Sequence, residues 1–313
     1  MQKINKNWAT DEANKRSWMH KNSLYRENFE HASCGVGMVV SIEGKPSRKV
    51  VELGIDALKA IWHRGAVDAD GKTGDGAGIH VQMPGSFFYE RIERAGHTPR
   101  KDELMAVGQV FLPRADFGAQ ETCRSIVETE VLRMGYYIYG WRHVPVKTDC
   151  LGEKANATRP EIEQILISNS KGVDQDTFER ELYVIRRRIE KSASQAGVSQ
   201  LYLASLSCRS IIYKGMMLAE QVAVFYPDLC DERFTSTFAI YHQRYSTNTF
   251  PQWWLAQPFR MLAHNGEINT LKGNVNWMKS HEIRMASSAF GEMADDIKPI
   301  IPGGSSDSAA LDA

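Results

Sequence analysis

Apolar residues recur along this chain with two spacings, one typical of helices and the other typical of strands. The most regular helix is predicted over residues 174–195, where one apolar stripe consists of Phe178, Leu182, Ile185 and Ile189. Further helices are predicted over 48–65, 85–96, 117–135 and 270–285. Strands are predicted over 34–44, 76–84, 104–113, 136–146, 162–169, 201–215 and 234–247.

The order of these elements indicates the fold class. We expect two or more strands before each long helix, and short turns between consecutive strands. This order argues against a simple parallel βαβ array and favours an α+β layered fold.

The first residues differ from the rest of the chain. Residues 1–33 are polar and lack sustained periodicity, so we expect a separate leader followed by one domain over 34–313. The leader has no apolar core of the kind that secretory signals carry, and it contains acids such as Asp11, which organelle transit peptides usually lack. We therefore expect a cytoplasmic protein. At the other end, a helix-like pattern begins just before Ala313, so we expect the domain to continue past that residue.

Composition narrows the function classes. Of the 313 residues, 42% are hydrophobic, and no apolar run reaches the roughly eighteen residues of a membrane span. Lys+Arg and Asp+Glu both number 38, so the net charge is zero. A chain without basic excess has no general attraction for phosphate backbones, which argues against nucleic-acid binding.

The five cysteines contain no CxxC pair, so neither a disulfide framework nor a zinc site is indicated. We interpret Cys123, Cys208 and Cys230 as small buried hydrophobes. Cys150, in a polar stretch, is interpreted as a surface thiol. Cys34 sits between small residues directly before an apolar run, and three interpretations stay open: a buried core residue, half of a disulfide, or a nucleophile exposed when the leader is removed.

The glycine-rich stretch over 71–79 invites comparison with phosphate-binding loops. A P-loop needs Lys and Ser/Thr after its last glycine, and a dinucleotide fingerprint needs a helix there, but a strand is predicted to follow. We therefore predict a tight turn in which backbone approaches backbone.

Arg244 follows an apolar strand and precedes a loop that contains Asn248, Pro251, Gln252, Trp253 and Trp254. One interpretation is a surface arginine beside a pair of core tryptophans. The other is a bidentate clamp for a carboxylate beneath a mobile aromatic lid.

The stretch LAHNGEI, over 262–268, also has two interpretations. Asn-Gly is typical of a turn with positive φ, but the Asn265 amide and the Gly266 N–H could also form an oxyanion hole. His264 is a candidate base, with a structural role as its alternative. Asp307 fits the capped start of a helix, and could instead accept from a substrate ammonium.

Four motifs in this order resemble the class II, N-terminal nucleophile glutamine amidotransferases, and in detail the amidotransferase domains of glutamate synthase large subunits. They are FEHASCGVGMVV, HRGAVDADGKTGDGAGI, HQRYSTNTFPQWWLAQPFRMLAHNGEINTLKGN and SSDSAALD. The resemblance implies a four-layer αββα sandwich of two stacked antiparallel sheets, the Ntn hydrolase-like fold.

The resemblance also implies a mechanism. The chain would be cut between Ser33 and Cys34, so that Cys34 carries both the thiol nucleophile and a free α-amine. An α-amine has a pKa of about 7.7–8.0, so it can act as the base and no histidine is needed. Asn265 and Gly266 would stabilise the oxyanion, Arg244 would bind the α-carboxylate of L-glutamine, and Asp307 its α-ammonium.

Family members of this kind continue into synthase domains with FMN and an iron–sulfur cluster, served by a small NAD(P)H-oxidising subunit or by ferredoxin. We expect neither cofactor nor a metal in this segment, which would supply ammonia to a site that reduces 2-oxoglutarate. Two alternatives stay open: the amidotransferase domain of another class II enzyme, or a non-catalytic binding module with the same fold.

Overall fold

A computed structural model divides the chain into two compact units, Met1–Cys34 and Gly35–Ala313. It describes residues 8–26, 34–244 and 250–313. The first unit contains one helix, α1 (Trp8–Asn22), which the sequence analysis did not predict. Because α1 has no apolar stripe, its periodicity gave no signal. The basic residues His20 and Lys21 in its last turn complement the helix dipole.

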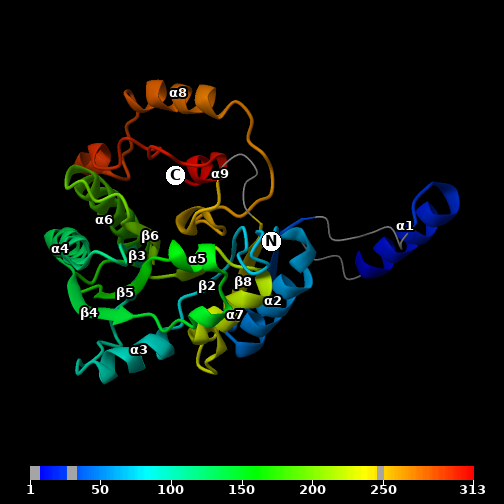
Figure 1. Ribbon diagram of the computed structural model, residues 1–313, viewed down its shortest axis with the longest axis horizontal. Helices are drawn as coiled ribbons and strands as arrows, with labels where there is room; N and C mark the ends of the chain where they lie inside the picture. Colours follow the sequence, from blue (N-terminus) through cyan, green and yellow to red (C-terminus); the bar gives the residue numbers. More distant parts are fainter. Residues whose placement is uncertain (1–7, 27–33, 245–249) are drawn as a thin grey trace. The chain divides into compact units, whose positions relative to one another are not determined.

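Two four-stranded sheets form the framework of the second unit (Figure 1), in the strand orders β1-β8-β2-β7 and β4-β5-β3-β6. Every pairing between these strands is antiparallel. The first sheet consists of β1 (Val36–Val40), β8 (Phe238–Gln243), β2 (Ala77–Gln82) and β7 (Ser210–Gly215). The second consists of β4 (Tyr137–His143), β5 (Glu161–Ser168), β3 (Met105–Leu112) and β6 (Tyr202–Ser207).

Along the chain, the helices of the second unit connect these strands or follow the last of them. They are α2 (Arg48–Ala60), α3 (Gly85–Arg94), α4 (Phe117–Arg133), α5 (Glu153–Ala157), α6 (Gln175–Gln195), α7 (Val222–Phe225), α8 (Leu271–Glu282) and α9 (Asp307–Asp312). Helix α6 begins after Asp174, whose carboxylate accepts the N–H groups of Asp176 and Thr177. The apolar stripe predicted for this helix is fully buried.

Two clusters of buried side chains explain how the layers pack. One cluster joins the sheets, and includes Ile79 and Tyr213 from the first sheet and Val107 from the second. The other includes Ala106, the neighbour of Val107, together with residues of α4 and α6. Because neighbouring residues of a strand point to opposite faces, the second sheet turns one face to the first sheet and the other to α4 and α6. The α+β class with stacked sheets is confirmed.

The expected order of strands and helices was wrong. Helices mostly alternate with single strands, and only β6 and β7 follow each other directly. Most strands that are neighbours in a sheet are nevertheless not consecutive in the chain, β4 and β5 excepted, so the intervening helices do not join parallel neighbours. Alternation along the sequence does not fix strand direction.

Two cysteine predictions also need revision. Cys123 and Cys208 are buried as predicted, but Cys230 is exposed. It lies at the end of a short 3-10 turn, and its thiol donates to the carbonyl of Ala223. Cys150 is half-buried against the main core rather than on the open surface.

Candidate active site

The glycine-rich stretch forms the tight turn that the sequence predicted. A Cβ on Gly74 would lie 2.2 Å from the carbonyl carbon of Met217, so only glycine permits this approach of two backbones. Gly76 has a φ of 147°, and its carbonyl accepts the N–H of Arg244 at 2.9 Å. The turn therefore fixes the residue that follows β8.

Arg244 itself has a φ of 101°, a conformation that residues other than glycine rarely adopt. Its side chain is half-buried. Strain of this kind costs about 1–3 kcal/mol and persists only where the surroundings enforce it. The loop residue Asn248 lies outside the described residues.

The tryptophans that follow differ in burial. Trp253 is 4% exposed, belongs to the main core, and donates from Nε1 to the carbonyl of Ala155 at 3.0 Å. Trp254 is partly buried against the same core. Trp253 is therefore the core residue that one interpretation expects, whereas Trp254 is only partly buried.

Gly35 connects the start of the second unit to two predicted site residues. Its carbonyl accepts the N–H of Gln243, the residue before Arg244. A Cβ on Gly35 would lie 2.1 Å from the carbonyl oxygen of Gln243 and 3.0 Å from Nδ2 of Asn265. Only glycine fits this position. Cys34, which is exposed, directly precedes Gly35 in the chain.

The segment that carries Asn265 and Gly266 is fixed by polar side chains. The Gln257 amide donates to the carbonyl of His264 at 3.0 Å and accepts the His264 N–H at 3.1 Å. Nε2 of His242 also lies 3.0 Å from that carbonyl. Gln257 and His242 are both buried, whereas Asn265 and Gly266 are exposed. The side chains that hold this segment are therefore buried, whereas Asn265 and Gly266 themselves are exposed to solvent.

His264 has a structural contact within this turn. Its Nδ1 accepts the N–H of Gly266 at 2.9 Å. Neither Asn265 nor Gly266 has a positive φ angle, so the segment is not the turn that Asn-Gly usually forms. In this structure the Gly266 N–H is engaged by its own neighbour, and the Asn265 amide is the more accessible donor.

Asp307 is 3% exposed and lies at the first position of α9, after the capping residue Ser306. Its Oδ2 accepts the N–H of Ile268 at 3.0 Å. At the last position of α9, the Asp312 carboxylate accepts the Met261 N–H at 2.7 Å. Helix α9 thus binds the segment over 261–268 at both ends, and the capped helix start expected around Asp307 is confirmed, with Ser306 as the cap.

Burial sets the charge of His242. The pKa of this histidine is lowered to about 4 by burial, although the His264 carbonyl and the Asn265 side chain oppose the shift. His242 is therefore neutral at neutral pH. The His264 carbonyl can only accept, so His242 must carry its proton on Nε2.

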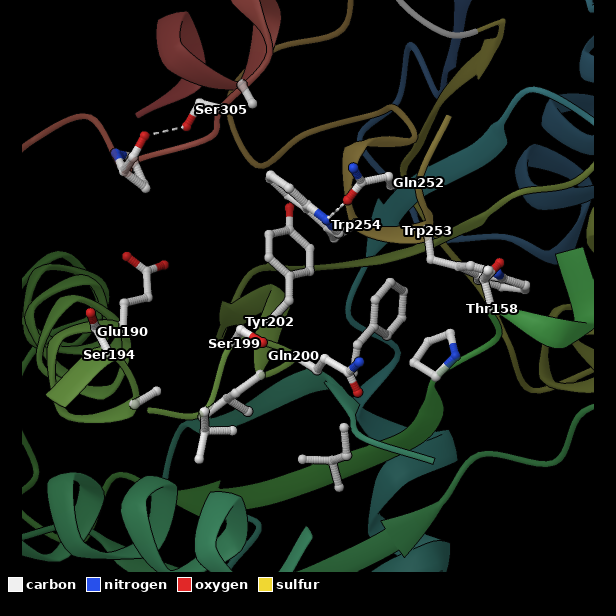
Figure 2. Close-up of a pocket in the computed structure, with 18 of the residues that line it drawn as sticks. Thr158, Glu190, Ser194, Ser199, Gln200, Tyr202, Gln252, Trp253, Trp254 and Ser305 are labelled. Atoms are coloured by element: carbon white, nitrogen blue, oxygen red, sulfur yellow. Dashed lines mark hydrogen bonds between the residues drawn. The ribbon is translucent and has the colours of Figure 1, made fainter. Parts of the chain in front are cut away.

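A cavity of about 990 Å³ lies elsewhere in the second unit (Figure 2). Its walls include Tyr202, Trp254 and Glu190, and Figure 2 shows the hydrogen bond from the Trp254 indole to Gln252. None of the predicted site residues lines it. Cavity size therefore does not locate the predicted site.

Over residues 8–26, 34–244 and 250–313, no group of three or more His, Cys, Asp and Glu side chains could hold a metal ion. No helix in this part of the chain is long and apolar enough to cross a membrane.

Comparison with known proteins decides the family. Residues 34–313 match the class II glutamine amidotransferases. The chain belongs to this family. The large chain of glutamate synthase [NADPH] from Azospirillum brasilense is 66% identical over 290 residues, which make up 93% of this chain and 19% of that protein. The corresponding protein of Bacillus subtilis is 42% identical over 294 residues, 92% of this chain and 19% of that protein.

A plant relative matches the same region. Ferredoxin-dependent glutamate synthase 2, chloroplastic, from Arabidopsis thaliana is 41% identical over 285 residues, 91% of this chain and 17% of that protein. This amidotransferase chain therefore spans less than one fifth of the length of these three relatives.

Three residues that hold the segment around Asn265 in place were not predicted from the sequence. His242 is part of the third motif, but a lone histidine in an apolar strand does not by itself indicate a functional role. Gln257 pairs with a backbone seven residues away, a contact that no pattern predicts. Asp312 could have been noticed as a second acid on the helix that starts at Asp307.

Proposed function

We propose that this chain hydrolyses the side-chain amide of L-glutamine to L-glutamate and ammonia, with the Cys34 thiol as the nucleophile. The observation that carries the proposal is the position of Gly35. This residue, which follows Cys34, packs against Gln243 and against the Asn265 amide. A donor of oxyanion type thus lies beside the residue that adjoins the thiol, in a chain of this family.

The proposed chemistry begins with proton transfer. The α-amine of Cys34 takes the thiol proton, and the sulfur attacks the amide carbon of glutamine. Asn265 donates to the oxyanion that forms, and Gly266 joins it once its N–H leaves His264. The C–N bond breaks as the proton passes to the leaving nitrogen, which departs as ammonia. Water then attacks the thioester, releases glutamate and restores the thiol.

The same proposal assigns substrate recognition to two side chains. Arg244 binds the α-carboxylate of glutamine, since guanidinium groups bind carboxylates in a planar, bidentate geometry. Asp307 accepts from the α-ammonium. Its burial and its bond to Ile268 support a place next to the segment that carries Asn265 and Gly266.

The mechanism requires residue 34 to be the first residue of the active chain. We therefore propose that residues 1–33 are a leader that is removed. The family match begins at Cys34, and the boundary between the compact units follows the same residue. The start of the family match supports a cut between Ser33 and Cys34, and the unit boundary lies one residue further along.

We further propose that the ammonia is used by a synthase site that reduces 2-oxoglutarate in the cytoplasm. The names of the relatives support NADPH or ferredoxin as the electron source. FMN and an iron–sulfur cluster would lie in the regions of those longer proteins that this chain does not match. The described part of this chain offers no metal-binding group for such a cluster.

Glutaminase assays on the natural full-length protein test the proposal. Intact mass should show a chain that begins at Cys34, and Cys34→Ala should abolish hydrolysis. Asn265→Ala should lower kcat by about 10²–10³, the usual effect of one lost oxyanion donor, with little change in KM. His264→Ala should be much milder. Full activity in a chain that still begins at Met1, or a His264 loss as deep as that of Cys34, would overturn the mechanism.

A further inference from the structure

Three residues form one row across the first sheet. His242 of β8 lies opposite Gly78 of β2, and Gly78 lies opposite Lys214 of β7. Residues that lie directly opposite in a sheet share a face, so all three point to the same side. This row faces the segment over 254–264.

Each member of the row meets a different carbonyl of that segment. Nζ of Lys214 donates to the carbonyl of Trp254 at 2.9 Å. A Cβ on Gly78 would lie 2.7 Å from the carbonyl oxygen of Gln257, so the missing side chain leaves room for the peptide. His242 contacts the carbonyl of His264, the residue before Asn265. The row therefore supports the segment along its length, and His242 supports its functional end.

The Asn265 amide lies between two neighbours. On one side, Nδ2 is 3.0 Å from the position of a Cβ on Gly35. On the other, the Asn265 backbone follows the His264 carbonyl, which Nε2 of His242 contacts at 3.0 Å. Both ends of the amide lie against Gly35, since Oδ1 is 3.3 Å from the same Cβ position, and the peptide that carries them is held by His242.

We propose, on the basis of the glutaminase function above, that His242 is a positioning residue that fixes the orientation of the Asn265 amide for oxyanion binding. Its Nε2–H holds the peptide that precedes Asn265 and so sets where the Asn265 side chain begins. His242 contacts neither the thiol nor the substrate in this role.

Two variants of similar size separate hydrogen bonding from packing. His242→Gln keeps an N–H donor near the position of Nε2, whereas His242→Met has the same unbranched length without a donor. In the natural full-length protein beginning at residue 34, His242→Met should lower the kcat of glutaminase by about 10- to 100-fold, with KM within threefold, because positioning affects the transition state. His242→Gln should restore kcat to within about fivefold of the native value.

A double-mutant cycle tests whether His242 affects kcat through Asn265. If His242 acts through Asn265, adding His242→Met to Asn265→Ala should cause no further loss of kcat. A full additional loss would overturn the proposal, and so would equal kcat values for the Met and Gln variants.

His80 supplies a matched control. It is buried in the same sheet and on the same face as Gly78, two residues along β2, and burial lowers its pKa to about 4 as well. No hydrogen bond between His80 and the segment over 254–264 is present among the described residues. His80→Met should therefore leave kcat unchanged. A kcat loss equal to that of His242→Met would show a general effect of sheet repacking and overturn the proposal.

Crystal structures of the two His242 variants give a readout that does not depend on activity. The Asn265 amide should be displaced in His242→Met and retained in His242→Gln. An unmoved amide in both variants would overturn the proposal. Retained glutaminase in Cys34→Ala would instead refute the proposed function, while the structures would still decide whether His242 positions Asn265.

Discussion

At the scale of single residues, the site depends on conformations and contacts that are unfavourable elsewhere in a protein. Arg244 occupies a strained backbone conformation, and Gly35 packs where no side chain fits. Buried His242 remains neutral and has one Nε2–H to donate. Each feature has a cost that the surrounding fold must offset, and strain of this kind gathers at functional sites.

Arg244 allows strain and function to be separated. Arg244→Gly should stabilise the fold or leave it unchanged, because glycine adopts a φ of 101° without steric cost. The same change should raise the KM for glutamine by more than tenfold, through loss of a charge-assisted contact of about 1.5–3 kcal/mol. Arg244→Lys keeps the charge and loses the planar fork, so its KM for glutamine should lie between those of the native protein and Arg244→Gly. Steady-state kinetics and urea denaturation would check both effects, and an unchanged KM in both variants would remove Arg244 from the site.

At the scale of elements, helices with a buried stripe could be predicted well and long-range pairing could not. Phe178 and its partners on α6 repeat at helical spacing, so the chain itself reveals that helix. Helix α1 lacks such a stripe and was missed. The exposure of Cys230 depends on what packs over a short turn, and no local pattern encodes that.

The candidate site shows the same limit. The motifs around Cys34, Arg244, Asn265 and Asp307 could be recognised because each is a short run of sequence. The bond from Gln257 to His264 and the contact of His242 with the same carbonyl require the folded chain, since they join a strand, a loop and a turn.

The close contact of β2 with the segment above it gives a prediction for stability. A Cβ on Gly78 would lie 2.6 Å from Cβ of Lys214 and 2.7 Å from the Gln257 oxygen. Gly78→Ala should therefore lower the free energy of unfolding by about 1–3 kcal/mol, as overpacking usually does. Gly303, where a Cβ meets nothing within 4 Å, is the control, and Gly303→Ala should change stability by less than about 0.5 kcal/mol. Midpoints of urea denaturation, compared at an unchanged m-value, would measure both changes in stability. Equal midpoints for the native protein and Gly78→Ala would contradict the close contact.

At the scale of the whole molecule, the two buried histidines make stability depend on pH. Burial lowers the pKa of His80 and of His242 to about 4, against about 6.5 in an unfolded chain. Between these values the unfolded state binds more protons, so the free energy of unfolding falls as the pH decreases from about 6.5 to 4.

His80→Phe isolates one of these contributions. From pH 7 to pH 5, the native protein should lose about 2 kcal/mol more stability than the variant, because the variant has no proton to take up at this position. Asp312 favours the protonated form of His80 and opposes the shift, but burial dominates. Denaturant titrations of both proteins at the two pH values would measure the difference. Parallel loss of stability in the two proteins would show that His80 is not held neutral.

Helix α9 links parts of the chain that the sequence separates. Its two terminal carboxylates accept the N–H groups of Met261 and Ile268, on either side of Asn265. Fixing one residue costs about 1–2 kcal/mol of backbone entropy, and these two bonds help to offset that cost for the segment between them. The backbone N–H groups of Met261 and Ile268 are thus both hydrogen-bonded while α9 is in place. Release of the helix would open both groups to hydrogen exchange. We therefore expect the order of the segment over 261–268 and the seating of α9 to form a single local opening equilibrium.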